Sequence, residues 1–198
     1  MKSNVRNYAD VDILNRIEKH VDGFTHFPKN KWGVGVRSTE DAYNKFDDKF
    51  YVFEGEKLLM VNSITTNAGS RGLKNFETYN EEGCAVFKSD VIVYDSHKLG
   101  MSKGRTVYRQ DKSFPYYRDN NRNNYAEEIG RVHHGVIYAH IHDAKMGDKD
   151  EYKEFINGWS TACQVMNNGK EWNDFLKLMD GQEYITYCLL KEFEYSLD

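Results

Sequence analysis

Short apolar runs separated by turn-forming residues fill most of this 198-residue chain, and they constrain its fold more than any other feature. The stretch 50–61 holds two such runs around Glu54-Gly55-Glu56, a pattern typical of a β-hairpin. Helical spacing of apolar residues is found in 10–22, where Gly23 is expected to cap the helix, and in 170–179. Many short strands and few helices predict a mainly β (α+β) fold in a single domain, 1–198. The other strand-like runs are 32–37, 84–87, 91–94, 106–109, 135–142 and 184–190.

Bulk properties exclude several classes of protein. A net charge of −4 argues against nucleic-acid binding through overall charge. No apolar run approaches the roughly 18–20 residues that cross a bilayer, so no membrane span is expected. The first residues lack the apolar stretch of a secretory signal, which predicts synthesis in the cytoplasm. A set of three cysteines, Cys84, Cys163 and Cys188, does not indicate a disulfide framework.

Cys163 is the cysteine whose surroundings suggest chemistry. Cys84 and Cys188 stand among apolar residues, where a free cysteine is usually a small core side chain. Cys163 instead follows Gly158, Ser160 and Thr161, which are small turn formers. A turn of this kind can expose a thiol and direct main-chain N–H groups at one point, as an oxyanion hole requires. The competing interpretation is again a buried, inert thiol.

His140 and His142 are two residues apart, so on a strand they project to the same face. Three interpretations compete: a polar strand face, a metal site to which His133 and His134 add ligands, and a general base for a nucleophile. Neither Cys-x-x-Cys nor His-Glu-x-x-His accompanies the pair, so the metal signal is weak. A thiol needs a nearby base to become a nucleophile, and a histidine of this pair could supply it to Cys163; the residues alone leave the three interpretations open.

The order of these residues resembles the catalytic domain of the L,D-transpeptidase (YkuD-like) family. His142 is followed after twenty-one residues by Cys163, as the family's histidine is followed by a serine-containing cysteine motif. Trp159-Ser160, Cys163 and Gln164-Val165 match a divergent branch, found in phage and some bacterial genomes, with Trp-Ser-x-Gly-Cys-Gln-Val. Further segments similar to that branch extend the resemblance over about 33–180; they are 35–37, 44–48, 65–69 and 117–121.

The resemblance implies a YkuD-like β-sandwich or barrel-type domain and acyl transfer through a cysteine on peptidoglycan stem peptides. It assigns Cys163 as the nucleophile, His142 as its base and Ser160 to the catalytic turn. It implies no cofactor and no metal, and its partners are stem peptides or, for a phage protein, virion proteins at a cell wall reached through a virion or lysis. Residues assigned to substrate binding are His140, Trp159, Gln164 and Arg118.

Two departures from the family pattern bear on activity. Ala162 stands where the family has glycine, and alanine would strain the turn by about 1 kcal/mol or more if that position needs a positive φ. Asp143 follows His142, and an acid there is expected to raise the pKa of the histidine and favour a thiolate–imidazolium pair. Either departure is also consistent with a non-catalytic homologue that serves as a virion or cell-wall-binding protein.

Overall fold

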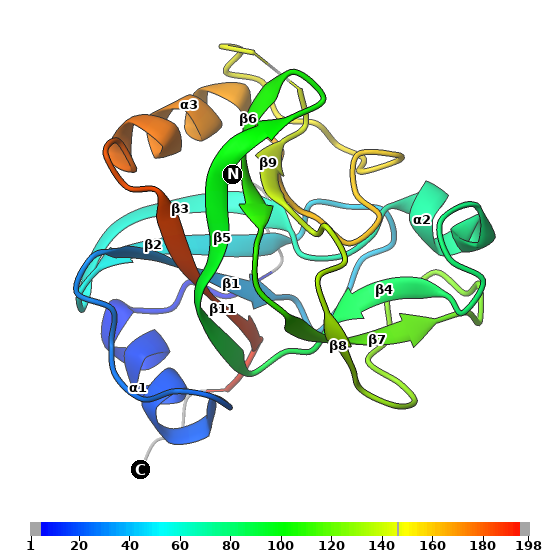
Figure 1. The fold of residues 1–198 in the computed structure, drawn as a ribbon, viewed down its shortest axis with the longest axis horizontal. Helices are drawn as coiled ribbons and strands as arrows, with labels where there is room; N and C mark the ends of the chain where they lie inside the picture. Colours follow the sequence, from blue (N-terminus) through cyan, green and yellow to red (C-terminus); the bar gives the residue numbers. More distant parts are fainter. Residues whose placement is uncertain (1–4, 146, 195–198) are drawn as a thin grey trace.

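A computed structural model of the chain describes residues 5–145 and 147–194. Eight strands among these residues close into a barrel (Figure 1). A separate three-stranded sheet, in the order β4 (Cys84–Phe87), β7 (Phe114–Asp119) and β8 (His133–Gly135), lies beside it. The predicted mainly β fold with short helices is confirmed. Around the barrel the order is β1 (Lys31–Arg37), β11 (Tyr184–Lys191), β5 (Val91–Ser102), β6 (Arg105–Gln110), β9 (Ile141–Asp143), β10 (Gln164–Met166), β3 (Lys57–Thr65) and β2 (Asp48–Glu54).

The helices contribute to two separate hydrophobic clusters. Ile13 and Ile17 of α1 (Asp10–His20) pack with the outward side chains of β1, β2 and β11. Trp172 and Phe175 of α3 (Gly169–Leu178) pack with the second cluster, which fills the barrel. Two short elements, α2 (Ser70–Lys74) and the 3-10 helix η1 (Phe76–Thr78), precede β4. Among the described residues, no helix combines the length and apolar character needed to cross a membrane.

Strand β1 shows why the glycines interrupt an apolar run. Val34 packs in the cluster that includes α1, whereas Gly33 and Gly35 face the rings inside the barrel. A Cβ at Gly33 would lie 2.5 Å from the Phe50 ring, and one at Gly35 would lie 2.2 Å from the Tyr187 hydroxyl. The glycines therefore leave space for aromatic side chains that fill the barrel.

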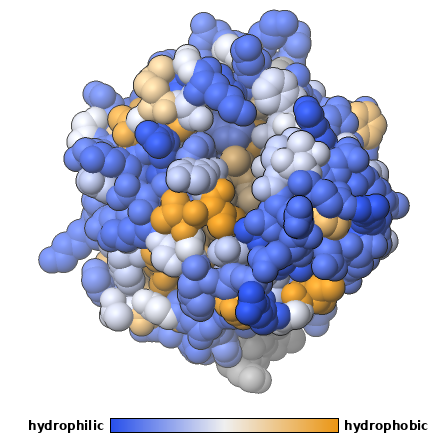
Figure 2. Space-filling view, turned by 45° about the vertical axis from the view of Figure 1, so that its right-hand side comes forward, coloured by the Kyte–Doolittle hydropathy of each residue, from blue (hydrophilic) through white to orange (hydrophobic). Residues whose placement is uncertain are grey.

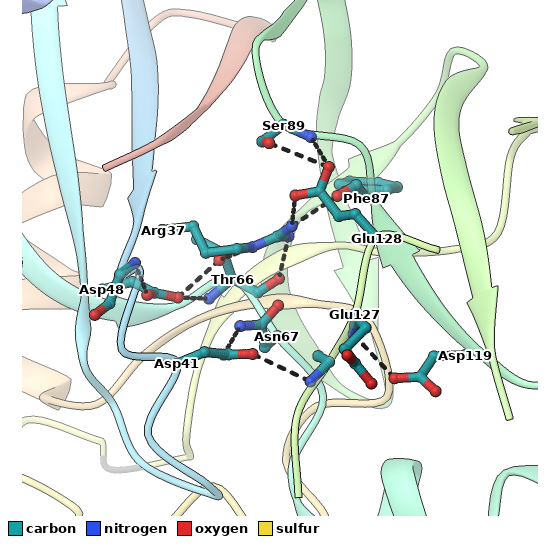
Figure 3. Close-up of polar contacts among 12 residues, drawn as sticks. Arg37, Asp41, Asp48, Thr66, Asn67, Phe87, Ser89, Asp119, Glu127 and Glu128 are labelled. Carbon is teal, nitrogen blue, oxygen red and sulfur yellow. Dashed lines mark hydrogen bonds and ion pairs between the residues drawn. The ribbon is translucent and has the colours of Figure 1, made fainter. Parts of the chain in front are cut away.

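Arg37 lies at the end of β1 and organises a buried polar network (Figure 3). Its guanidinium donates to the side chain and carbonyl of Thr66, to the Phe87 carbonyl at 2.9 Å and to Glu128 at 2.7 Å. Glu128 in turn accepts from the N–H and hydroxyl of Ser89. The arginine thus joins the barrel to β4 and to the loop that follows β7.

Three carboxylates extend this network. Asp48 is fully buried and accepts hydrogen bonds from the Ser38 N–H and from the N–H and hydroxyl of Thr66. Asp41 accepts from the Asn67 amide and the main chain of the loop after β7 (Figure 3). Burial raises the pKa of Asp47 to about 8, and the adjacent Asp48 charge acts in the same direction. Burial also raises the pKa of Asp48.

Several predicted elements agree with the structure, and two differ from it. The hairpin of β2 and β3 turns at 55–56, as predicted. Helix α1 ends at His20, two residues before the predicted end, and Val21 rather than Gly23 is its C-cap. The predicted strand 135–142 is wrong as a continuous element, because only its ends lie in β8 and β9.

The irregular segment 136–140 is held by a side chain rather than by a strand. The side-chain oxygen Oε1 of Gln110 accepts the N–H groups of Ile137 and Ala139, and its side-chain Nε2 donates to the Gly135 carbonyl. These bonds satisfy main-chain groups that a β-ladder would otherwise pair. The chain can therefore leave the sheet there and return as β9.

Candidate active site

Parallel pairing of β9 with β10 brings the two predicted catalytic residues together. Val165 is the register partner of His142, and the Gln164 N–H donates to the His140 carbonyl at 2.9 Å. Strand β10 was not predicted from the sequence. Cys163, which precedes it, and the side chains of His140 and His142 all line one cavity of about 460 Å³. Residues more than twenty positions apart thereby share one site.

The Cys163 thiol is half-buried and held between main-chain groups. Its sulfur lies 3.8 Å from the Tyr138 carbonyl, to which the S–H donates. Burial raises the pKa of Cys163 to about 11, while the main-chain N–H of His140 and the charges of Lys103 and Arg105 act to lower it. Cys163 is therefore a neutral thiol at pH 7.

His142 has the tautomer that a base needs. Its Nδ1–H donates to the Asp143 carbonyl at 2.7 Å, which leaves the Nε2 lone pair as the acceptor of the neutral ring. Burial is the main cause that lowers the pKa of His142 from its ordinary value. At pH 7 the buried imidazole is neutral and can accept a proton.

Asp143 acts to raise the pKa of His142, as predicted, but the pKa of the histidine is nevertheless lowered from its ordinary value. The Asp143 carboxylate forms an ion pair with Arg105 at 3.3 Å, and the Arg105 charge opposes its effect on the histidine. Burial of the ring lowers the pKa of His142 by more than Asp143 raises it. A neutral thiol and a neutral imidazole that line the same cavity replace the predicted thiolate–imidazolium pair.

His140 faces the same cavity with the opposite hydrogen-bonding character. Its Nδ1 accepts the Gln110 N–H at 3.1 Å, so the neutral ring carries its proton on Nε2. Burial lowers the pKa of His140 to about 4, and the neighbouring His142 contributes in the same direction. His140 therefore presents a donor where His142 presents an acceptor.

Ser160 supports the turn rather than the thiol. Its hydroxyl donates to the Cys163 carbonyl at 2.8 Å, and its own carbonyl accepts the Gly69 N–H at 3.0 Å. Ala162 is not among the residues with positive φ, so the strain expected from replacing glycine is absent. Alanine is compatible with this turn.

Of the four residues predicted to bind substrate, His140, Trp159 and Arg118 line a cavity and Gln164 does not. Trp159 lines the cavity that contains His142, and Arg118 lines a second cavity of about 310 Å³ that also reaches Cys163. Gln164 is fully buried inside the barrel, where it accepts from the Tyr187 hydroxyl at 2.7 Å and donates to the Ala162 carbonyl at 3.1 Å. The structure therefore places Gln164 beneath the turn and outside both cavities.

The two cavities share Cys163 as a lining residue. Tyr79, Tyr138 and Thr161 line both. The second cavity is bounded by residues of α2, β4 and β7, which are on the right in Figure 1. Figure 2 brings that side forward and shows a hollow with hydrophobic residues at its edge among mostly hydrophilic ones. Cys163 thus lies between two cavities and lines both of them.

The residues that hold this site in place were not predicted from the sequence. His97 is fully buried, and its Nε2–H donates to the Ala139 carbonyl at 3.0 Å, next to His140. Asn44 accepts the N–H groups of Ser70 and Asn157 and so holds the loop before Cys163 against α2. Both side chains bind main-chain groups that are distant in the sequence. The spacing of residues along the chain does not indicate such contacts. Asn44 lies in a segment of the resemblance, but its role was not assigned.

Within 5–145 and 147–194, no three His, Cys, Asp or Glu side chains converge as a metal site would require. Comparison of the chain with protein-family models, with curated proteins and with solved structures finds no match.

Proposed function

We propose that the chain is a cysteine acyltransferase of the L,D-transpeptidase type that acts on peptidoglycan stem peptides. One observation carries the proposal: Cys163 and a neutral His142 with a free Nε2 lone pair line the same cavity. The substrate class comes from the sequence resemblance. The geometry supports the reaction type.

The first half-reaction forms a thioester. The Cys163 S–H proton moves to His142 Nε2 as the sulfur attacks a peptide carbonyl carbon, and the carbonyl electron pair moves to oxygen. Collapse of this tetrahedral intermediate breaks the C–N bond, and His142 returns the proton to the departing amine. An amine or water then attacks the thioester and releases Cys163, with His142 again moving the proton. An amine gives a cross-link and water gives cleavage.

The negative oxygen of the intermediate needs donors near Cys163. No acceptor is found in the described part of the chain for the N–H groups of Ala162 and Cys163, so both remain available to it. Hydrogen bonds of Ser160 and Gln164 to the carbonyls of this turn fix its conformation. Donors that are fixed before the reaction stabilise charge without reorganisation.

The raised pKa of Cys163 sets the expected pH dependence. A neutral thiol must be deprotonated during attack, so activity should require unprotonated His142 and fall in acid. Because the pKa of His142 is lowered, this fall should lie below the ordinary histidine pKa of about 6.5. A kcat/KM profile with its acid limb above pH 7 would contradict the assignment.

The decisive test is capture of the thioester by intact-protein mass spectrometry after mixing with purified muropeptides. The wild type should gain the mass of the acyl fragment and turn over, whereas Cys163→Ala should do neither while keeping its melting temperature. Cys84→Ala, which removes another thiol of the second cavity, should retain the adduct. Turnover by Cys163→Ala near the wild-type rate would exclude this mechanism.

A non-catalytic cell-wall-binding or virion protein is the second candidate, and the raised pKa of Cys163 favours it. It predicts that the wild type and Cys163→Ala bind isolated sacculi equally and that neither changes muropeptide composition. Co-sedimentation with sacculi and muropeptide chromatography distinguish the two candidates.

A further inference from the structure

Two buried side chains hold the main chain of Ala139, which is itself buried. Gln110 Oε1 accepts the Ala139 N–H at 3.1 Å, and His97 Nε2–H donates to the Ala139 carbonyl at 3.0 Å. His97 on β5 and Gln110 on β6 are register partners, so their side chains leave the same face of the sheet. Both polar groups of Ala139 are therefore fixed from that face.

The first peptide group fixed in this way directs a carbonyl at Cys163. A trans peptide bond is planar, and its N–H and C=O point in opposite directions. The bond between Tyr138 and Ala139 is trans, and its N–H is bound to Gln110. The Tyr138 carbonyl therefore points the other way, where it accepts the Cys163 S–H at 3.8 Å.

The second peptide group directs an N–H at the same sulfur. The Ala139 carbonyl is bound to His97, so the His140 N–H of that trans peptide points the other way and hydrogen-bonds Cys163. Burial lowers the pKa of His97 to about 4, so its ring is neutral at pH 7. The Ser96 hydroxyl bonds Nδ1 of this ring at 2.8 Å, which fixes the Nε2–H tautomer.

The two peptide groups have opposite effects on the thiol. A carbonyl that accepts the S–H stabilises the neutral thiol, whereas an N–H that donates to the sulfur stabilises the thiolate. The cations that face Cys163 across its two cavities are Lys103, Arg105, Lys145 and Arg118. The other titratable groups that line these cavities are His140, His142, Cys84, Tyr79, Tyr116 and Tyr138. His97 and Gln110 line neither cavity, so substitutions there leave all these side chains in place.

We propose that His97 and Gln110 are positioning residues that hold the His140 N–H and the Tyr138 carbonyl against Cys163 and thereby set how readily its thiol ionises. The use of that thiol in acyl transfer rests on the proposed function. Its ionisation depends on the two peptide groups alone and can be measured without turnover. Side chains that only satisfied buried main-chain groups would affect stability and leave the ionisation unchanged.

The ionisation of Cys163 is measured by NMR on protein labelled with ¹³C at the cysteine Cβ, whose chemical shift changes when the thiol loses its proton. Cys84→Ser and Cys188→Ser assign the three resonances. The alkaline titration is run in about 0.5 M NaCl, because salt screens the exposed cations far more than it weakens buried hydrogen bonds. Circular dichroism at each pH reports whether the fold is intact.

His97→Phe should move the titration to higher pH. It keeps an aromatic ring next to Tyr187 and removes the donor to the Ala139 carbonyl. The His140 N–H then loses its fixed direction, and the pKa of Cys163 should rise by about one unit, as expected for one lost hydrogen bond. His97→Gln retains a side-chain donor and should restore the wild-type titration.

Gln110→Met should move the titration the other way. Without an acceptor for the Ala139 N–H, the Tyr138 carbonyl turns from the sulfur and the neutral thiol loses its partner. The pKa of Cys163 should fall by about one unit. Gln110→Glu keeps an oxygen acceptor, and its negative charge opposes formation of the thiolate, so it should not show this fall.

Ile13→Ala is the control for a general loss of stability. It creates a cavity in the separate cluster that includes α1 and should leave the Cys163 titration unchanged. Shifts of the same sign in His97→Phe and Gln110→Met, or no shift in either, would overturn the proposal.

A second measurement needs no substitution at His97 or Gln110. The His140 amide proton should move upfield in Cys163→Ala, because it loses the sulfur as acceptor. The Ala139 amide proton, which is bound to Gln110, should stay in place. A His140 amide that does not respond to the loss of the sulfur would also overturn the proposal.

The outcomes separate this proposal from the proposed function. The expected titration shifts in a protein without muropeptide turnover would retain the two positioning residues and reject the proposed reaction. With active enzyme, His97→Phe should lower kcat and leave KM nearly unchanged, since His97 lines neither cavity. A rise in KM with unchanged kcat would count against a role in setting the reactivity of Cys163.

Discussion

Two buried polar clusters in this molecule differ in how completely their groups are paired. In the Arg37 network the guanidinium is bound by Thr66, Phe87 and Glu128, and Asp48 accepts three hydrogen bonds (Figure 3). In the Cys163 site, His142 retains the Nε2 lone pair and the thiol makes a long contact of 3.8 Å to the Tyr138 carbonyl. Paired groups stabilise a fold, whereas a group with spare hydrogen-bonding capacity is available for chemistry.

The backbone shows the same contrast. A positive φ value near the Arg37 network occurs at Asp41, a residue type that tolerates this conformation. At the Cys163 site positive φ values occur at Lys103, Tyr138 and Lys145, which tolerate it less well. The site therefore holds strain that the network avoids, as is common where function selects the conformation.

The largest effect is expected from His142→Gln. Glutamine cannot take the thiol proton, so kcat/KM on muropeptides should fall by about 10²- to 10⁴-fold. The free energy of unfolding should change little by comparison, because an amide can still donate to the Asp143 carbonyl. Steady-state kinetics and urea unfolding measure the two quantities.

The matched control is His134→Gln, an exposed histidine outside both cavities, which should be nearly silent. A loss of stability in His142→Gln comparable to its loss of activity would mean that this histidine has a structural role like the network residues.

Arg37→Met should lower the stability of the protein and leave the reactivity of Cys163 unchanged, which is the reverse of the result expected for His142→Gln. It leaves Glu128 and the surrounding carbonyls without their buried partner, at a cost of about 3–5 kcal/mol in the free energy of unfolding. At temperatures where the variant stays folded, the iodoacetamide rate of Cys163 should match the wild type. Arg16→Met breaks a more exposed pair with Asp90 and should cost about 1 kcal/mol or less. Similar costs for the two arginines would show that the network contributes no more than a surface ion pair.

The sequence predicted the strands and helices whose apolar periodicity is local. The β2–β3 hairpin and α3 belong to this class. It did not predict β10, because three residues are too few for a periodic pattern. It also merged β8 and β9, because the side chain that interrupts them, Gln110, lies in another strand. Short elements held by distant side chains carry no local signal.

For the candidate site, the family resemblance pointed to Cys163, His142, His140 and Trp159, which share one cavity. Gln164 was assigned to substrate binding because it belongs to the motif that resembles the family. Strand alternation instead directs it into the barrel, toward Tyr187. Protonation states were equally hidden from the sequence, since they depend on burial and on hydrogen bonds such as His142 to the Asp143 carbonyl.

Asp47→Asn tests whether the Arg37 network makes the free energy of unfolding depend on pH. The raised pKa of Asp47, about 8, means that the folded state holds a proton that the unfolded chain loses near pH 4. Wild-type stability should therefore fall as pH rises from about 4 to about 8, by up to about 1.4 kcal/mol per pH unit, and then level off. Asparagine cannot ionise, so the variant should lack this contribution.

Urea unfolding at several pH values measures the difference, and Asp111→Asn at an exposed position is the control. Parallel stability curves for the wild type and Asp47→Asn would show that the carboxyl pair is not protonated in the fold.

Tyr138→Asn is expected to have the smallest effect on stability and tests the strain at the Cys163 site. Tyr138 has φ of 60° and is 67% exposed, so its ring adds little burial to offset the strained conformation. Asparagine adopts this region more readily, and the free energy of unfolding should rise by about 0.5–1 kcal/mol. Activity should fall nonetheless, because the ring lines both cavities beside Cys163.

Tyr125→Asn replaces another exposed tyrosine that lacks a positive φ, and it should not gain stability. Equal changes in the two variants would indicate that the backbone at Tyr138 is no more strained than an ordinary surface position, and the contrast with the network would then rest on hydrogen bonding alone.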